Sequence, residues 1–164
     1  MSESKVKVMC DRICLINPEI KIHTLKERCS SKKYSMLIEN NVDYLIDAID
    51  SVEDKVSLLK FCFDSRIPVV SCMGTAGKLN PTAFKVADIA NTSVCPLARL
   101  VRKKLRKLGI TSGIKVIYSD EISINKKDLK CDYINKCCNG SISFVPSVAG
   151  LIAASVVVND IIKF

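Results

Sequence analysis

An apolar run over residues 44–49 ends in two carboxylates, Asp47 and Asp50, whose types and spacing could do chemistry. Acidic residues are poor strand formers, so two of them at the end of a buried run need a reason. In parallel α/β sheets, ligands bind just outside the carboxyl ends of the strands. A carboxylate at that place suits a magnesium ion that arrives with phosphates, because hard cations prefer oxygen ligands. The pair therefore predicts a nucleotide site.

A second candidate site is a strongly basic helix that Pro96 opens. No acidic residue occurs between residues 96 and 113. Like charges at spacings of three and four residues destabilise a helix, which favours an anionic partner. A nucleic-acid backbone would supply the counter-charge, and a solvated basic face is the alternative. The candidate contacts are Arg99, Arg102, Lys103 and Arg106.

The composition is that of a soluble globular chain long enough to bury a core. The 164 residues are 48% hydrophobic and 26% charged, and the net charge of +8 favours polyanionic partners. Residues 1–5 lack the basic region and apolar core of an export signal, so we expect a cytoplasmic protein with reduced thiols. The nine cysteines form no Cys-x-x-Cys pair, so we expect no structural zinc. Cys72 and Cys95 are expected to be packed thiols, with a reactive role as the alternative.

Hydrophobic periodicity predicts the elements that must position these residues. An apolar strand, a helix of about four turns and a second apolar strand read as a parallel β-α-β unit. The predicted helices cover residues 5–16, 52–63, 96–108 and 147–162. The predicted strands cover residues 20–25, 44–49, 67–72, 84–89, 116–118 and 140–146, and residues 123–139 are expected to be a loop.

The last predicted helix is apolar almost all round, so it is either buried or spans a membrane. Its apolar run, residues 144–158, contains Pro146 and falls short of the roughly 20 residues that a span requires. We therefore expect no membrane segment. Packing against the sheet and a homodimer seam remain as alternatives.

Six blocks of the chain form an ordered set of motifs. They read Asp-Ala-Ile-Asp-Ser at 47–51, Ser-Cys-Met-Gly-Thr at 71–75, Lys-Leu-Asn-Pro at 78–81, Val-Ala-Asp-Ile at 86–89, Thr-Ser-Val-Cys-Pro-Leu-Ala-Arg at 92–99 and Gly-Ser-Ile-Ser-Phe-Val-Pro-Ser-Val-Ala-Gly at 140–150. Together they resemble the tRNA threonylcarbamoyladenosine dehydratases, a branch of the ubiquitin-activating-enzyme-like superfamily. The blocks fall in the family's order over residues 4–163. The resemblance implies an α/β fold with an incomplete Rossmann-like mixed sheet. Residues 1–90 would be the second half of a nucleotide-binding domain, and residues 91–164 a C-terminal α+β extension of the same structural unit.

The resemblance also implies a reaction. Members of this family use ATP with Mg²⁺ to activate the threonyl carboxylate of N6-threonylcarbamoyladenosine in tRNA, in a ligase-like step that ends in cyclisation and loss of water. It further implies sulfur-transfer or cysteine desulfurase proteins as possible partners, whereas the expected homodimer follows from the apolar last helix. Electrostatic stabilisation of phosphate charge is then the main demand on the protein.

The family's functional residues carry over one by one. Asp50 matches the aspartate that handles magnesium and the ATP phosphates, and Lys5 matches a phosphate-contacting lysine on the first helix. Ser4 and Lys7 depart from the family's proline and acidic residue around that lysine, so a solvated lysine is the alternative. By the same resemblance the cofactor-binding segment comprises Asp47, Ala48, Ile49, Asp50 and Ser51.

The family's Gly-x-Gly-Gly-Val-Gly-Ser loop, whose amides cradle phosphates at a helix start, does not occur among the six glycines. We therefore expect a C-terminal part of such an enzyme, inactive by itself, with an open sheet edge that favours aggregation or dimerisation. A non-catalytic tRNA-binding or oligomerisation module is the alternative. A sulfur-carrier adenylyltransferase is a weaker one, because those enzymes typically carry two Cys-x-x-Cys pairs.

Overall fold

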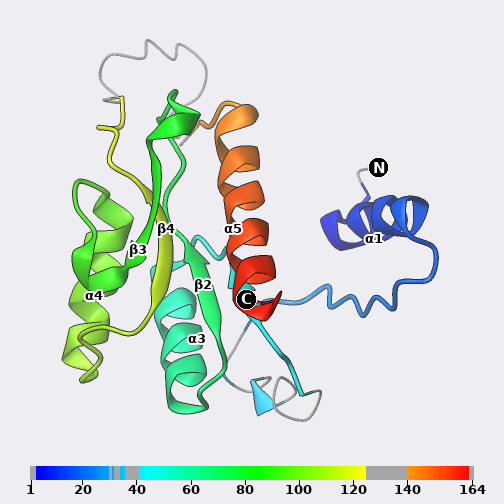
Figure 1. Ribbon diagram of the computed structural model, residues 1–164, viewed down its shortest axis with the longest axis horizontal. Helices are drawn as coiled ribbons and strands as arrows, with labels where there is room; N and C mark the ends of the chain where they lie inside the picture. Colours follow the sequence, from blue (N-terminus) through cyan, green and yellow to red (C-terminus); the bar gives the residue numbers. More distant parts are fainter. Residues whose placement is uncertain (1–2, 30, 32–33, 36–40, 125–139, 163–164) are drawn as a thin grey trace.

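A computed structural model describes residues 3–29, 31, 34–35, 41–124 and 140–162. Its centre is a mixed four-stranded sheet in the order β1-β2-β4-β3, which confirms the predicted α/β class (Figure 1). The strands β1, β2 and β4 are parallel, and β3 runs antiparallel to β4. The strands are β1 (Leu45–Asp47), β2 (Val69–Cys72), β3 (Phe84–Asp88) and β4 (Lys115–Ser119).

Helices cover both faces of this sheet. The helices α3 and α4 pack side by side on one face, and α5 lies against β2 and β4 on the other (Figure 1). The helices are α1 (Lys5–Ile16), α3 (Val52–Asp64), α4 (Pro96–Lys107) and α5 (Phe144–Ile162), with short 3-10 turns η2 (Pro81–Ala83) and η3 (Ile89–Asn91). Because β4 pairs with both β2 and β3, the predicted parts 1–90 and 91–164 share one sheet.

Two apolar cores hold the layers together. On the α3 and α4 face, Leu59 and Leu105 are fully buried with Val116 of β4. On the other face, Ala149 and Ala153 of α5 pack against Val70 and Ile117. Small residues on α5 let its backbone lie close to the sheet. The helix can therefore pack tightly on the short strands β2 and β4.

The helix α4 begins and ends as its sequence predicts. Pro96 occupies the first turn, where its missing N–H costs no hydrogen bond. Gly109, two residues beyond the helix, has a φ of +83°, a left-handed conformation that glycine adopts without strain. The strongly basic segment is therefore a helix of twelve residues.

Two predicted strands are wrong. Residues 20–25 form no regular element and pair with no strand of the described sheet, and Ile20 and Leu25 are exposed. Residues 140–146 do not form a strand either, because α5 already begins at Phe144. Pro146 falls in the first turn of that helix, where the backbone N–H is not needed, and Val145 is fully buried. Most of the predicted loop at 123–139 lies outside the described residues.

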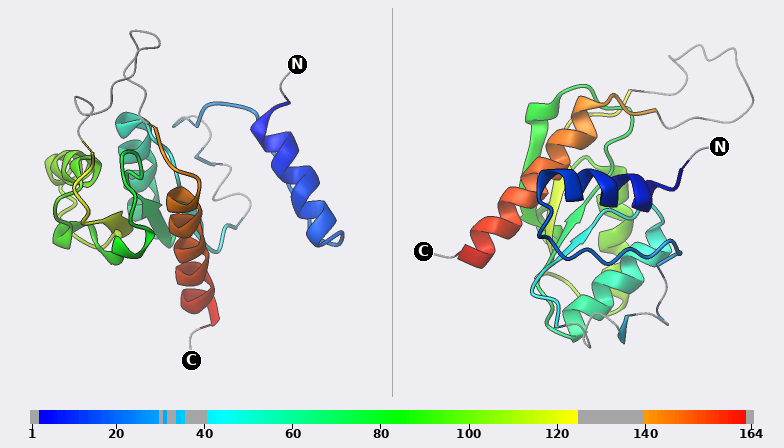
Figure 2. Two further views of the ribbon diagram at one scale, coloured as in Figure 1. Left: turned by 90° about the horizontal axis from the view of Figure 1, so that it is seen from above. Right: turned by 90° about the vertical axis from the view of Figure 1, so that its right-hand side faces the viewer.

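The helix α1 forms as predicted but lies apart from the sheet (Figure 2). None of its residues is buried, and Met9, Leu15 and Ile16 leave apolar surface exposed. The apolar residues of α1, which recur three and four positions apart, are therefore not buried against any other element in the described part of the chain.

The helix α5 is long and apolar enough to cross a membrane by length and composition alone. One side of it packs on the sheet through Val145, Ala149 and Ala153. The other side leaves apolar residues exposed, including Leu151, which is 70% accessible. The predicted packing of this helix against the sheet is thus observed, and apolar side chains on its other face are exposed among the described residues.

Because α5 packs closely on the sheet, a larger side chain should destabilise the protein more on the packed side of this helix than on its exposed side. We expect Ala153→Leu to lower the free energy of unfolding by about 1–3 kcal/mol, because overpacking a filled core forces side chains and backbone to shift. Ala154→Leu adds the same bulk at an exposed position of the same helix and should change it by less than about 0.5 kcal/mol. Urea unfolding of the two variants measures both values, and equal losses would contradict this packing.

Candidate active site

Asp47 has a buried partner that explains why an acidic residue ends the first strand. Its Oδ2 accepts hydrogen bonds from Lys55 Nζ at 2.6 Å and from Ser71 Oγ at 2.5 Å. Its Oδ1 accepts from the Ile49 amide at 2.9 Å. Both charged side chains have zero exposure. Asp47 is thereby engaged inside the protein and does not line the cavity described below.

Lys55 joins the ends of two neighbouring strands. Besides Asp47 of β1, its Nζ donates to Ser71 Oγ at 3.2 Å and to the Cys72 carbonyl at 3.0 Å, both in β2. A buried lysine requires such a full set of acceptors. The sequence interpretation missed this residue. The available signal was a lysine on the buried side of a predicted helix, eight residues after an aspartate at a strand end.

Asp50 lies in the turn between β1 and α3 and is exposed. Ser51, which follows it, is the N-cap residue of α3, although its side chain makes no capping hydrogen bond. The Asp50 carboxylate makes no hydrogen bond within the described residues. It is therefore free for a ligand, whereas Asp47 is not. The tight turn after β1 is fixed by the hydrogen bond from the Ile49 amide to Asp47, so the buried carboxylate positions the free one.

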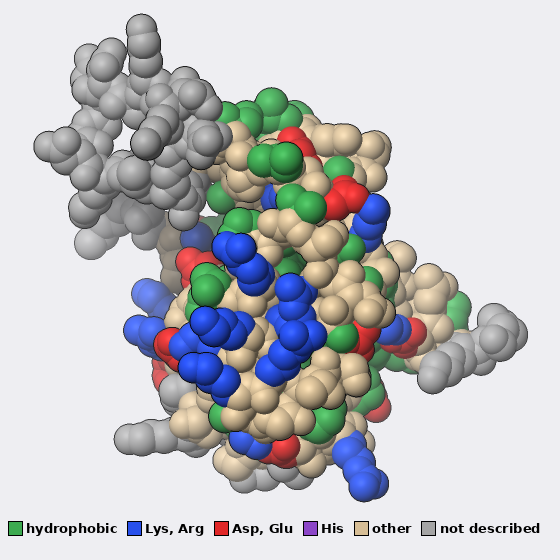
Figure 3. Space-filling view, turned by 90° about the vertical axis from the view of Figure 1, so that its left-hand side faces the viewer, with side chains coloured by type: hydrophobic (Ala, Val, Ile, Leu, Met, Phe, Trp, Pro, Cys, Tyr) green, Lys and Arg blue, Asp and Glu red, His purple; other side chains and the backbone are tan. Residues whose placement is uncertain are grey.

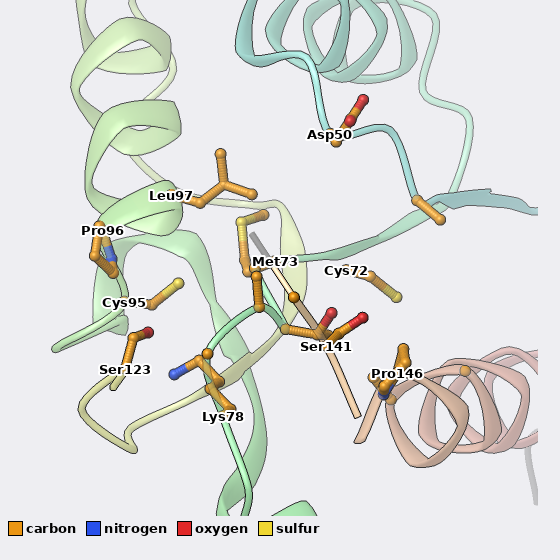
Figure 4. Close-up of a pocket in the computed structure, with 18 of the residues that line it drawn as sticks. Asp50, Cys72, Met73, Lys78, Cys95, Pro96, Leu97, Ser123, Ser141 and Pro146 are labelled. Atoms are coloured by element: carbon orange, nitrogen blue, oxygen red, sulfur yellow. The ribbon is translucent and has the colours of Figure 1, made fainter. Parts of the chain in front are cut away.

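A cavity of about 790 Å³ opens beside Asp50 (Figure 4). Its walls come from the turns after β1 and β2, the start of α4 and the start of α5. The side chains on these walls are mainly apolar or small. Among the predicted cofactor-binding residues, Ala48, Ile49 and Asp50 line this cavity. Ser51 instead lines an adjoining hollow together with Asp50, Arg28 and Asp54.

Lys5 is not brought to this site. It is the first residue of α1, which has no buried residue and lies apart from the sheet (Figure 2). Among the described residues, Arg28 is the cation that lines a hollow together with Asp50. Its Nε and Nη2 donate to Asp54 Oδ2 at 3.0 and 2.7 Å. The Arg28 hydrogen bonds hold the pKa of the Asp54 carboxyl below its usual value. The predicted role of Lys5 stays a prediction.

Four basic residues were predicted to bind nucleic acid, and the structure separates one from the rest. Arg99, Lys103 and Arg106 are exposed on α4 at spacings of four and three residues, which places them along one side of the helix. Lys and Arg side chains gather on this face of the molecule (Figure 3). We call these three residues the basic stripe.

Arg102 points inward instead. Its Nη1 donates to the Thr92 carbonyl at 2.7 Å and to the Ile89 carbonyl at 3.4 Å, and it also contacts Thr92 Oγ1. These contacts tie the turn before α4 to the body of the helix. Val94 in that turn has a φ of +58°, a conformation that β-branched residues rarely adopt. Arg102 thus holds a strained turn at the start of α4.

Burial affects the cysteines around the site. Burial raises the pKa of Cys72, and Asp47 adds to the rise while Lys55 opposes it. Burial likewise raises the pKa of Cys62 to about 11. Cys95 is buried at the start of α4. Cys95 is packed as expected, whereas Cys72 is half-buried, and both line the cavity, so the absence of a reactive role stays a prediction. No group of three or more potential metal ligands occurs among the described residues.

Comparison with known proteins identifies relatives over the full chain. Residues 1–164 match the model of the ThiF family. The tRNA threonylcarbamoyladenosine dehydratase of Bacillus subtilis is 41% identical over 172 residues, covering 99% of this chain and 68% of the relative. The protein of that name from Haemophilus influenzae is 29% identical over 171 residues, covering 97% of this chain and 66% of the relative.

Solved structures give the same relationship. The crystal structure of Escherichia coli tRNA N6-threonylcarbamoyladenosine dehydratase, TcdA, in complex with AMP is similar to this fold, with a TM-score of 0.86 and 27% identity. The alignment covers 99% of this chain and 65% of that chain. A complex of the E. coli protein with ATP is similar as well, with a TM-score of 0.85. The chain thus spans about two thirds of the length of these relatives.

The buried ion pair beneath the site predicts a large cost for removing one partner. We expect Lys55→Met to lower the free energy of unfolding by about 3–5 kcal/mol, because it leaves the Asp47 carboxylate buried without a counter-charge. The double variant Asp47→Leu/Lys55→Met removes both charges and should lose less than Lys55→Met alone. Lys60→Met, at a half-exposed lysine of the same helix that pairs with Asp64, is the matched control and should have a small effect. Denaturant titration of the four proteins gives the comparison, and a Lys55→Met variant as stable as Lys60→Met would refute the account.

Proposed function

Since the chain belongs to the ThiF family and to its tRNA threonylcarbamoyladenosine dehydratase branch, we propose that it carries out the ATP-dependent dehydration of N6-threonylcarbamoyladenosine in tRNA. The observation that carries the proposal is the free carboxylate of Asp50 at the carboxyl end of parallel strands, beside a cavity. That is the position where ligands bind in open α/β sheets. The ATP and AMP complexes of the similar E. coli protein support a nucleotide as one of those ligands.

The reaction has two steps. A carboxylate oxygen of the threonyl group attacks the α-phosphorus of ATP, so that pyrophosphate leaves and an acyl-adenylate forms. A nucleophilic atom of the same threonylcarbamoyl group then closes on the activated carbon, a proton is lost and AMP leaves. The modified base has lost one water in total. The phosphate leaving group turns a poor electrophile into a good one, and the barrier falls mainly through stabilisation of phosphate charge.

Asp50 is the residue of this chain that we assign to the chemistry. Magnesium in such sites is bound through one or two carboxylates together with the phosphates of the nucleotide. The exposed, unbonded Asp50 carboxylate fits that arrangement, and when bound the ion would neutralise phosphate charge. Asp47 acts indirectly, because its hydrogen bond from the Ile49 amide sets the turn that presents Asp50. Ala48 and Ile49 complete this edge of the site.

We assign contact with the tRNA backbone to the basic stripe. Its three exposed residues carry positive charge along a helix without acidic residues, and phosphate contacts dominate affinity in such surfaces. The Nη1 atom of Arg102 already donates a hydrogen bond to the turn before α4, so this atom is not available for a phosphate contact. Lys104 is paired with Glu53 on α3 and is also less available.

A homodimer through the outward face of α5 belongs to the same proposal. Leu151, Val158 and Ile161 leave that face apolar and exposed, and such surface commonly marks an interface. The edge strand β1 offers a second surface for pairing. The cytoplasmic location and the sulfur-transfer or cysteine desulfurase partners remain predictions from the sequence.

A reconstitution assay tests the proposed reaction. The chain is mixed with ATP, Mg²⁺ and tRNA containing N6-threonylcarbamoyladenosine, with and without the part of the B. subtilis relative that the chain does not match. We expect product only in the complete mixture, seen by mass spectrometry as a nucleoside lighter by one water. Asp50→Asn should lower the rate by about 100-fold or more, as loss of a key electrostatic contact does.

The matched control is Asp64→Asn, which removes an exposed carboxylate at the far end of α3. It should leave the rate unchanged. No product in the complete mixture, or an Asp50→Asn variant as fast as Asp64→Asn, would contradict the proposal. Salt-sensitive tRNA binding without any product would point to the non-catalytic binding module instead.

A further inference from the structure

We propose that Arg102 is a positioning residue of the active site, which acts by holding the strained turn from which the wall at residues 95–97 begins. The inference rests on the proposed function for its effect on the reaction rate. The hold on the turn itself can be measured without any reaction. This role differs from the contact with nucleic acid that the place of Arg102 in the basic segment predicts.

The turn before α4 has an unfavourable backbone conformation. The Cys95 amide donates to the Ser93 carbonyl at 2.5 Å, which closes a turn of three residues around Val94. Val94 has a φ of +58°, and a turn of this kind with a positive φ at its centre is the rare, strained form of the γ-turn. Val94 is 55% exposed, so burial of its side chain does little to offset the strain. Such a conformation persists only where the surrounding structure fixes it.

The segment before this turn is fixed to the sheet. The Ile89 amide donates to the Ile114 carbonyl at 2.9 Å, and Asp88 Oδ2 accepts from the Gly113 amide at 2.6 Å. The Thr92 hydroxyl donates to the Ile89 carbonyl at 2.9 Å. These hydrogen bonds hold η3 and the residue after it, so one end of the strained turn is anchored.

Arg102 anchors the other end. Its Nη1 donates to the carbonyls of Thr92 at 2.7 Å and Ile89 at 3.4 Å, and these acceptors lie on the anchored segment. A guanidinium is planar, always charged and presents its donors in fixed directions, so it sets the position of the helix relative to that segment. With both ends held, Val94 stays in its strained conformation.

The residues that follow the turn form one wall of the cavity. Residues 95–97 line it, and Asp50 lies on another part of its lining (Figure 4). Leu97 is close to the turn after β2, because a Cβ added at Gly74 would meet Leu97 Cβ at 3.7 Å. If the strained turn relaxed, the start of α4 would shift relative to Gly74 and Asp50. A misplacement of about 1 Å in a site can cost about 100-fold in rate.

Two cysteines allow the hold on the turn to be measured directly. Cys95 follows the turn and is 2% exposed, whereas Cys62 is fully buried in the core and reports unfolding of the whole domain. The chain is labelled with iodoacetamide, and the rate at each thiol is read by peptide mass spectrometry. We expect Arg102→Ala to raise the labelling rate of Cys95 relative to that of Cys62 about tenfold or more, because the turn opens locally. Lys107→Ala, at an exposed position in the last turn of α4, is the matched control and should keep the ratio of the natural chain.

Val94→Gly tests whether strain at Val94 is the reason that Arg102 is needed. Glycine adopts a positive φ without steric cost, so its turn does not need to be held. In the Val94→Gly background, Arg102→Ala should therefore change the labelling ratio by less than about threefold. This comparison also serves when Arg102→Ala does not fold by itself. An equally large rise in both backgrounds overturns the inference.

The reconstituted mixture tests the effect on the reaction. We expect Arg102→Ala to lower kcat by about 10–100-fold and to change the KM for tRNA by less than about threefold, because it misplaces the site and removes no contact with tRNA. Arg106→Ala, in the basic stripe, should raise that KM and reduce the slope of log affinity against log salt by about one. Arg102→Ala should leave this slope unchanged.

The outcomes separate this inference from the proposed function. Unchanged labelling of Cys95 in Arg102→Ala, or an equal rise at Cys62, overturns the inference, because the turn is then not held locally. Faster labelling of Cys95 with an unchanged kcat overturns the positioning role, and a salt slope reduced by about one makes Arg102 a phosphate contact instead. Faster labelling of Cys95 alone, in a chain whose complete mixture forms no product, supports the hold on the turn and refutes the proposed reaction.

Discussion

The buried ion pair between Lys55 and Asp47 is the constraint on which the site depends. Two charges with zero exposure are stable only when every remaining donor and acceptor has a partner. Here the partners are Ser71, the Cys72 carbonyl and the Ile49 amide, so one network joins β1, β2 and α3 at their ligand-binding edge. If the pairing of β1 and β2 shifted by one residue, one of the two buried charges would lose its partner. It therefore fixes the turn that carries Asp50, and it leaves Asp50 as the carboxylate with freedom to meet a ligand.

Hydrophobic periodicity in the sequence predicted the regular helices and strands correctly. It failed for features that depend on contacts between distant parts of the chain. The α/β class, the parallel β1 and β2 pair and the basic helix followed from local pattern. Residues 140–146 looked like a strand, but apolar residues before a proline also open a helix, and only the sheet face beneath Val145 distinguishes the two. The Asp47 and Asp50 pair was singled out from residue type and spacing, yet spacing could not show that the Asp47 carboxylate is buried against Lys55. Arg102 was grouped with its basic neighbours because its contact with the turn before α4 leaves no mark in the sequence.

The α4 face and the α5 face of the molecule differ in chemical character. The α4 face carries the basic stripe and leads to the cavity, while the α5 face is apolar and open. The proposed contact of α4 with the tRNA backbone would be sensitive to salt and would carry little sequence information, so it would not by itself distinguish a modified base. Apolar side chains of α1 and α5 are exposed among the described residues, and β1 is an edge strand of the described sheet. The chain spans about two thirds of its relatives' length.

Backbone amide NMR of the labelled chain tests the central claim most directly, namely that the buried Lys55–Asp47 pair fixes the turn that presents Asp50. We predict that Lys55→Met shifts the amide resonances of Ala48, Ile49 and Asp50, whereas Lys60→Met leaves them in place. Unchanged resonances of Ile49 and Asp50 in a folded Lys55→Met chain would contradict the account.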